Sequence, residues 1–149
     1  MSEPESMEEK APDNLVSSGA PRERAFFNVN HYIENLVINF AAHVGNDKRF
    51  NLFARTHAVF NIGIIAGVNE TLWKAYHFGP AHDILDKPEN VAQYTTLWLR
   101  LKALYEKYRS EKKVSVGDIL EELDNIVTEL IDFSREIMKQ SKCEQPQKP

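Results

Sequence analysis

The strongest structural signal in this chain lies in residues 116–137, which read VGDILEELDNIVTELIDFSREI. Apolar side chains recur there at alternating steps of three and four residues, and this spacing places them on one stripe of an α-helix. Residues 91–108 show the same alternation, so the sequence predicts two long amphipathic helices. The stripes are Val91, Tyr94, Trp98, Leu101, Tyr105 and Tyr108 in the earlier helix, and Val116, Ile119, Leu123, Ile126, Leu130, Phe133 and Ile137 in the later one.

These two helices are expected to form an antiparallel hairpin. The earlier one starts at Pro88, a residue suited to a first helical turn, and runs to about Lys112. The later one runs from Ser115 to about Gln140, and the short link between them favours antiparallel packing. Residues 100–113 carry six basic and two acidic side chains, whereas residues 118–139 carry seven acidic and two basic ones. The opposite charges are expected to complement each other.

Three further helices are predicted upstream. The first runs from Asn28 or Asn30 to Val44, and Gly45 is expected to end it in a left-handed conformation. The second and third are predicted over residues 48–65 and 70–78, and residues 81–85 are expected to add one more turn. A short strand over residues 62–68 remains an alternative. The fold class is therefore all-α, a bundle of about five helices with a C-terminal helical hairpin.

The second of these helices is apolar on most sides, which predicts that it is buried on most sides. Phe50, Phe53, Phe60 and Ile64 share one side with His57. Gly63 and Gly67 lie four residues apart, a spacing that lets a second backbone approach closely.

The chain has the length of a single domain. It has 149 residues, of which 42% are hydrophobic and 27% charged, with a net charge of −4. Residues 1–24 are rich in Glu, Ser and Pro and are expected to be disordered, as are residues 141–149, a polar tail that contains the single cysteine, Cys143. The helical domain is expected over residues 25–140. A secretory signal and an apolar run of membrane-spanning length are both missing, which favours a cytoplasmic protein without a membrane partner.

The function favoured by these patterns is a non-enzymatic, regulatory interaction module that acts through helix-to-helix docking and self-association. Leucine and isoleucine side chains flank both stripes, and a monomer of five helices is expected to leave some of them uncovered. The alternative, that both stripes face the core of a monomeric bundle, stays open. The residues expected at the interface are Trp98, Leu101, Tyr105, Leu123, Ile126 and Leu130.

A second hypothesis is a small-molecule or cofactor pocket between the second and third helices, formed by His57, Trp73, Tyr76 and His77. His57 on an apolar helix side is also typical of a hydrogen-bonded core histidine. No particular cofactor is predicted.

Metal binding has weak support in the sequence. His77, His82 and Asp83 form the tightest cluster of candidate ligands, but the paired histidine motifs of metal-binding helices are missing. A helix-terminating loop explains the same residues, so no metal is predicted.

Nucleic-acid binding is a weaker alternative, based on the basic residues 100–113 with Tyr105 and Tyr108 among them. The acidic net charge and the buried positions expected for both tyrosines argue against it. No catalytic residue is predicted, because the chain contains no nucleophile elbow and no glycine-rich phosphate loop.

Overall fold

The computed structural model describes residues 25–144 of the chain. In this part of the chain every regular element is a helix, which confirms the all-α fold class. The disordered tail predicted for residues 1–24 lies outside the described residues, as do residues 145–149. The helices are α3 (Ala25–Gly45), α4 (Leu52–His77), α5 (His82–Leu85), α6 (Pro88–Ser110) and α7 (Val116–Glu144).

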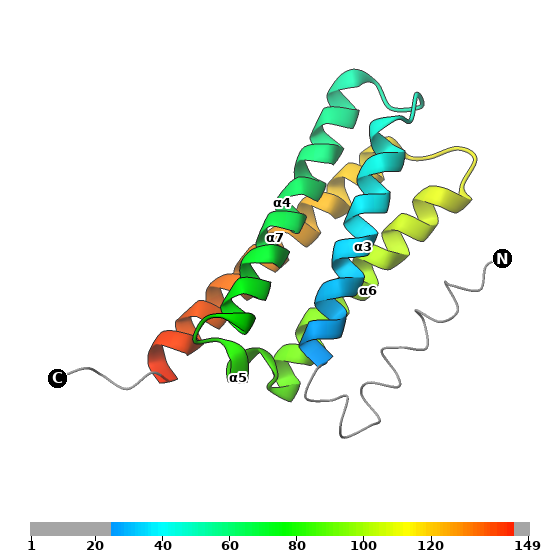
Figure 1. The fold of residues 1–149 in the computed structure, drawn as a ribbon. Coiled ribbons are helices and arrows are strands. Elements are labelled where there is room, and N and C mark those ends of the chain that lie inside the picture. The colour runs from blue at the N-terminus through cyan, green and yellow to red at the C-terminus, as the bar shows by residue number, and fades with distance from the viewer. Residues whose placement is uncertain (1–24, 145–149) are drawn as a thin grey trace.

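The four long helices form two antiparallel hairpins, α3–α4 and α6–α7, that lie side by side (Figure 1). The predicted C-terminal hairpin is thereby confirmed. Helix α3 packs against α4 and α6, and α7 packs against the same two helices. The tips of both hairpins lie at one end of the bundle, so α3 runs parallel to α6 and α4 runs parallel to α7 (Figure 1). The short helix α5 joins the hairpins at the other end.

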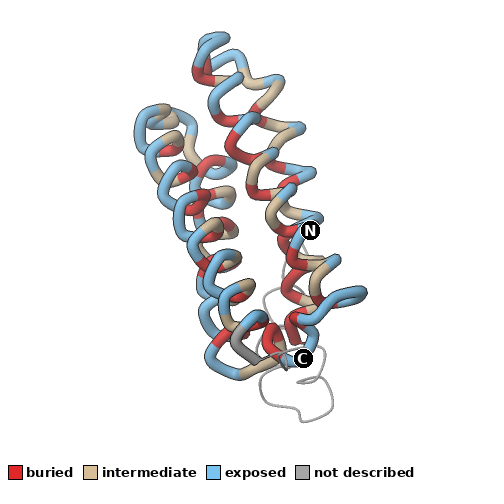
Figure 2. Tube along the Cα trace, turned by 90° about the vertical axis from the view of Figure 1, so that its left-hand side faces the viewer, coloured by how far each residue is buried: buried red, intermediate tan, exposed pale blue. Residues whose placement is uncertain are grey.

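Both apolar stripes line the interior of this bundle. Buried residues follow the inward side of each helix, while exposed ones follow the outward side (Figure 2). Tyr94 of α6 stacks on Phe26 of α3 and on Phe133 of α7, with ring centroids 4.9 and 5.4 Å apart. The hydrophobic contacts between α6 and its neighbours thus stabilise the bundle as one core.

Helix α4 corrects the prediction of two separate helices. It runs without interruption from Leu52 to His77, so both the break expected near residues 66–69 and the alternative strand over 62–68 are wrong. Asn69, which falls just before the helix predicted over residues 70–78, is buried inside α4 and is hydrogen-bonded to α3. Helix α4 instead begins after Asn51, whose side chain accepts a hydrogen bond from the Ala54 amide at 2.8 Å.

The ends of other helices also differ from the predictions. Helix α3 begins at Ala25, so Asn30 is an interior helical residue rather than a cap. No glycine in the described chain has a positive φ, and α3 ends without the left-handed Gly45 that was expected. The Asn46 side chain donates to the carbonyl of Ala42 there, at 2.9 Å. Helix α7 continues to Glu144, past the expected boundary at residue 140, and Ser141 is buried.

Two smaller predictions are confirmed. Pro88 occupies the first turn of α6, and the turn expected over residues 81–85 is present as α5. Among the helices of residues 25–144, none combines the length and apolar character that crossing a membrane requires.

Candidate functional site

The residues predicted as an interface lie inside the single-chain bundle. Trp98, Leu101, Leu123, Ile126 and Leu130 are buried, and Tyr105 is partly buried against the ring of Phe40. The flanking apolar residues are covered as well, because each hairpin packs over the stripe of the other. Leu99, which is 48% exposed, is the exception on α6. The residues predicted as an interface therefore belong to the core of a single chain.

The predicted pocket residues do not converge on one point. His57 precedes Trp73 by sixteen residues on the same helix, a separation of about 24 Å along its axis. Nε2 of His57 lies 3.1 Å from a carboxylate oxygen of Asp124 on α7, and the same oxygen accepts a hydrogen bond from Asn61 at 2.6 Å. His57 is exposed, so the expectation that it lies on a buried side of α4 is wrong.

The other three predicted pocket residues divide between the core and the surface. Tyr76 is buried, stacks on His82 with centroids 4.4 Å apart, and donates its hydroxyl to Asp86 at 3.0 Å. Trp73 is partly buried, stacks on the exposed His77 at 4.9 Å, and has its ring centroid 6.2 Å from that of Tyr76. These contacts explain the aromatic cluster without a cavity shared by all three residues.

The histidines at the end of α4 do not form a metal site. Within residues 25–142, whose side chains the structure describes, no group of three or more histidine, cysteine, aspartate or glutamate side chains is arranged to hold a metal ion. Nδ1 of His82 lies 3.2 Å from the carbonyl oxygen of Tyr76, so His82 contacts the end of the helix. His77 stacks on Trp73, and the weak ligand set His77, His82 and Asp83 is accounted for by these packing contacts and the turn.

Helix α4 turns an apolar face away from the bundle. Phe53 is 87% exposed and Phe60 is 67% exposed. Gly63 and Gly67 follow on the same side, and a Cβ atom added to either glycine would meet nothing within 4 Å. We call these four residues the outer face of α4. The sequence indicated the glycine pair, but it predicted the phenylalanines to be buried.

A groove of about 410 Å³ runs between α3 and α4. Its lining includes two buried asparagines, Asn30 and Asn69, and two glutamates, one from each helix. The sequence did not predict this groove, because Asn30 fits a helix cap and Asn69 falls between the helices predicted over residues 48–65 and 70–78. The signal that could have found it is the interior helical position of both amides. The lining residues are Asn30, His31, Glu34, Val37, Ile38, Ala66, Asn69, Glu70 and Trp73.

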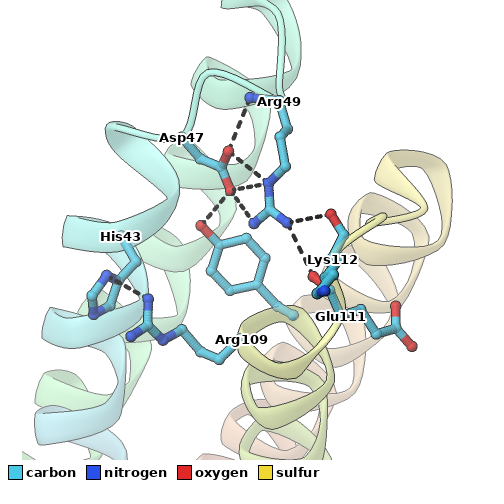
Figure 3. A network of polar contacts seen from close by, with 7 residues as sticks. His43, Asp47, Arg49, Arg109, Glu111 and Lys112 are labelled. Atoms are coloured by element: carbon cyan, nitrogen blue, oxygen red, sulfur yellow. Dashed lines mark hydrogen bonds and ion pairs between the residues drawn. The ribbon is translucent and has the colours of Figure 1, made fainter.

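A polar network ties the tips of the two hairpins together (Figure 3). The Arg49 guanidinium donates to the Asp47 carboxylate at 2.6 Å and to the carbonyls of Glu111 and Lys112 at 3.1 and 3.2 Å. The Tyr108 hydroxyl donates to the same carboxylate at 2.8 Å. We call Asp47, Arg49 and Tyr108 the tip clamp. Tyr108 lies 61 residues after Asp47 in the chain, so no local pattern predicts the tip clamp.

The tip clamp shifts the pKa values of its members. The Arg49 guanidinium holds the pKa of Asp47 well below its usual range, and the hydroxyl of Tyr108 adds to the effect. Burial, with the adjacent carboxylate, raises the pKa of Tyr108 to about 12. Both shifts indicate that the clamp stabilises an ionised Asp47 and a neutral Tyr108. These hydrogen bonds link the tips of the two hairpins.

The predicted charge complementarity between α6 and α7 is confirmed. Arg100 of α6 contacts two glutamates of α7, Glu122 at 3.2 Å and Glu129 at 2.6 Å. Lys102 pairs with Glu106 one helical turn further on, at 2.7 Å.

Comparisons of this chain with protein-family models, with curated proteins and with solved structures found no match.

Proposed function

We propose that this protein is a non-enzymatic helical interaction module that pairs with a second copy of itself through the outer face of α4. The observation that carries the proposal is the exposure of Phe53 and Phe60 beside two open glycines on a helix whose other side is fully packed. Large apolar side chains grouped on a surface are typical of a binding site.

The glycines strengthen this argument. Each glycine inside a helix costs about 0.5–1 kcal/mol relative to alanine. Within the described residues nothing crowds Gly63 or Gly67, so the packing of the monomer gives no reason for either. Close packing of a second helix on α4 gives a reason for both glycines, because the absence of side chains lets the two backbones come together.

The spacing along α4 favours a second copy over an unrelated helix. Two α4 helices that pair antiparallel around a point between residues 63 and 64 bring Phe60 of each copy against Gly67 of the other. Phe53 then lies beside Lys74 of the second copy, whose ammonium group and aliphatic stem both suit an aromatic ring. One surface thus supplies both the protruding and the receiving residues of a two-fold interface.

The basic stretch of α6 supports nucleic-acid binding less well. Arg100 is engaged by two carboxylates, and Arg109 donates to Nδ1 of His43 at 3.0 Å. Tyr108 is buried in the tip clamp. Both arginines of this stretch and Tyr108 are therefore already engaged within the chain.

Light scattering coupled to size-exclusion chromatography tests the proposal over a range from about 1 to 100 µM protein. The full chain is expected to approach twice its monomer mass as concentration rises. The double variant Phe53→Ser/Phe60→Ser is expected to stay a monomer with an unchanged circular dichroism spectrum, because both side chains are outside the core.

Leu99→Ser is the matched control, since it removes an exposed apolar side chain from α6 instead of α4. This variant should dimerise like the natural chain. A wild-type protein that remains monomeric throughout the range, or a dimer that survives the double substitution, contradicts the proposal.

A further inference from the structure

The groove between α3 and α4 has the size and composition of a small-molecule site. Its volume of about 410 Å³ falls within the range of ligand pockets, which is roughly 300–1,000 Å³. It lies beside the outer face of α4 and shares none of its four residues. A ligand bound in the groove is therefore distinct from a second copy bound at the outer face of α4.

The polar residues of the groove present a hydrogen-bond acceptor. Asn30 is 3% exposed, and its Nδ2 donates to the Asn69 carbonyl and to the Tyr94 hydroxyl, both at 3.0 Å. Its Oδ1 accepts no hydrogen bond from residues 25–144. In the described chain, the side-chain atoms that are both inaccessible to solvent and unpaired are Arg55 Nε and Asp86 Oδ1. Asn30 Oδ1 is not among them, so solvent can reach this oxygen.

The rim of the groove carries negative charge. Glu34 comes from α3 and Glu70 from α4, so a ligand in the groove lies between two carboxylates. Glu34 lies 3.4 Å from Nδ1 of His31, and Glu70 lies 3.5 Å from Nζ of Lys74. Lys74 is not part of the lining. The charges that line the groove therefore favour a cation over an anion.

Aromatic rings stand at one end of the groove and apolar side chains at the other. Trp73 lies 5.7 Å from the His31 ring and 5.2 Å from the Phe27 ring, measured between centroids. A tryptophan face attracts organic cations. Val37 and Ile38 provide an apolar wall, and Ile38 is 61% exposed although it lies beside the groove. An alkyl chain would cover that wall.

We propose that this groove binds a protonated primary amine with a short alkyl chain. The ammonium group donates to Oδ1 of Asn30 and lies between Glu34 and Glu70, near the face of Trp73. The alkyl chain extends over Val37 and Ile38. A neutral or anionic compound of the same shape lacks the attraction of the two carboxylates and is expected to bind more weakly.

Isothermal titration calorimetry at pH 7 with n-hexylammonium, 1-hexanol and hexanoate tests this proposal on the full chain. Hexylammonium is expected to bind with one site per chain and at least about tenfold more tightly than hexanol, while hexanoate shows no binding. Glu34→Gln/Glu70→Gln is expected to weaken hexylammonium binding about tenfold. Trp73→Phe is expected to weaken it less and to keep the preference for the cation.

Two control variants separate this site from other effects. Glu121→Gln removes one exposed carboxylate from α7, far along the chain from the groove, and should bind hexylammonium normally. Phe53→Ser/Phe60→Ser should also bind it normally, so failure of self-association leaves the amine site intact. Equal affinity for hexanol and hexylammonium, unchanged affinity in the double glutamine variant, or no binding at millimolar amine by folded protein overturns the proposal.

Discussion

Asn30 and Asn69 join α3 to α4 by a reciprocal pair of hydrogen bonds. The side-chain amide of each residue donates to the main-chain carbonyl of the other, and both bonds are 3.0 Å long. The Tyr94 hydroxyl of α6 donates to Oδ1 of Asn69, so three helices meet at one buried polar point. Both Nδ2 groups, Asn69 Oδ1 and the Tyr94 hydroxyl are thereby paired, and buried polar groups stabilise a fold when they are paired.

Replacement of Asn69 by alanine is expected to destabilise the bundle by about 2–3 kcal/mol. The substitution removes a donor to Asn30 and leaves the Tyr94 hydroxyl buried without its acceptor, and each unpaired buried group costs about 1–3 kcal/mol. Urea denaturation followed by circular dichroism measures the change. Asn125→Ala, at an exposed position on α7, is the control. Similar small effects for both variants would refute the stabilising role of the asparagine pair.

The tip clamp predicts a loss of stability in acid. The folded-state pKa of Asp47 lies below its ordinary value of 3.8, so its stabilising contribution is complete above about pH 4. The contribution decreases as the pH falls below that value, because the unfolded chain then binds the proton more readily. Asp47→Asn is expected to lower the free energy of unfolding near neutral pH by about 1 kcal/mol, since the charge-assisted bonds from Arg49 are lost.

The difference between wild type and Asp47→Asn is expected to shrink as the pH is lowered from 4 to 2. Chemical denaturation at several pH values checks this trend. Asp132→Asn, an exposed position on α7, should leave the free energy of unfolding within about 0.5 kcal/mol at neutral pH. A constant difference across the acid range would show that Asp47 is not stabilised by its charge.

Asp86 predicts the opposite pH dependence. Burial raises the pKa of this carboxyl above 3.8, and its Oδ1 is sealed without a hydrogen-bond partner. Its protonated form therefore favours the folded state, and that stability is lost as the pH rises through the folded-state pKa. The stability of Asp86→Asn relative to wild type is expected to improve between pH 4 and pH 7. Thermal denaturation across this range measures it, and a relative stability that falls with pH would contradict the assignment.

Alanine substitutions at the two open glycines, Gly63 and Gly67, are expected to affect the monomer and the dimer in opposite directions. In the Phe53→Ser/Phe60→Ser background, Gly63→Ala and Gly67→Ala are each expected to raise the free energy of unfolding by about 0.5–1 kcal/mol. In the natural chain the same substitutions are expected to weaken self-association, because the added methyl groups keep the two α4 helices apart. Denaturation and light scattering measure the two effects.

Gly79→Ala provides the control for the glycine series. A Cβ atom at Gly79 would lie 3.1 Å from the Ala75 carbonyl oxygen and 3.3 Å from Ala75 Cα, so this substitution should not stabilise the fold. If Gly67→Ala strengthened dimerisation, the close approach of two α4 backbones would be wrong.

The sequence by itself determined the all-α class, the antiparallel α6–α7 hairpin and the two apolar stripes, whereas the burial of both stripes inside one chain came from the tertiary structure. These features depend on spacing within one segment, and a three-four alternation of apolar residues predicts an amphipathic helix wherever the segment packs. The charge complementarity of α6 and α7 follows in the same way, because a short link leaves the two helices few ways to pack.

The orientation of α4 was decided only by the tertiary structure. This helix carries apolar residues on opposite sides, so periodicity alone could not distinguish the packed side from the exposed one. Contact with α3 and α7 buries the side that includes Ala58, Ile62 and Ile65, and it leaves Phe53 and Phe60 in solvent. The burial of Asn30 and Asn69 was equally unpredictable, since each amide is satisfied by a residue 39 positions away. The outer face of α4 and the groove both depend on these long-range contacts, which a local sequence pattern cannot predict.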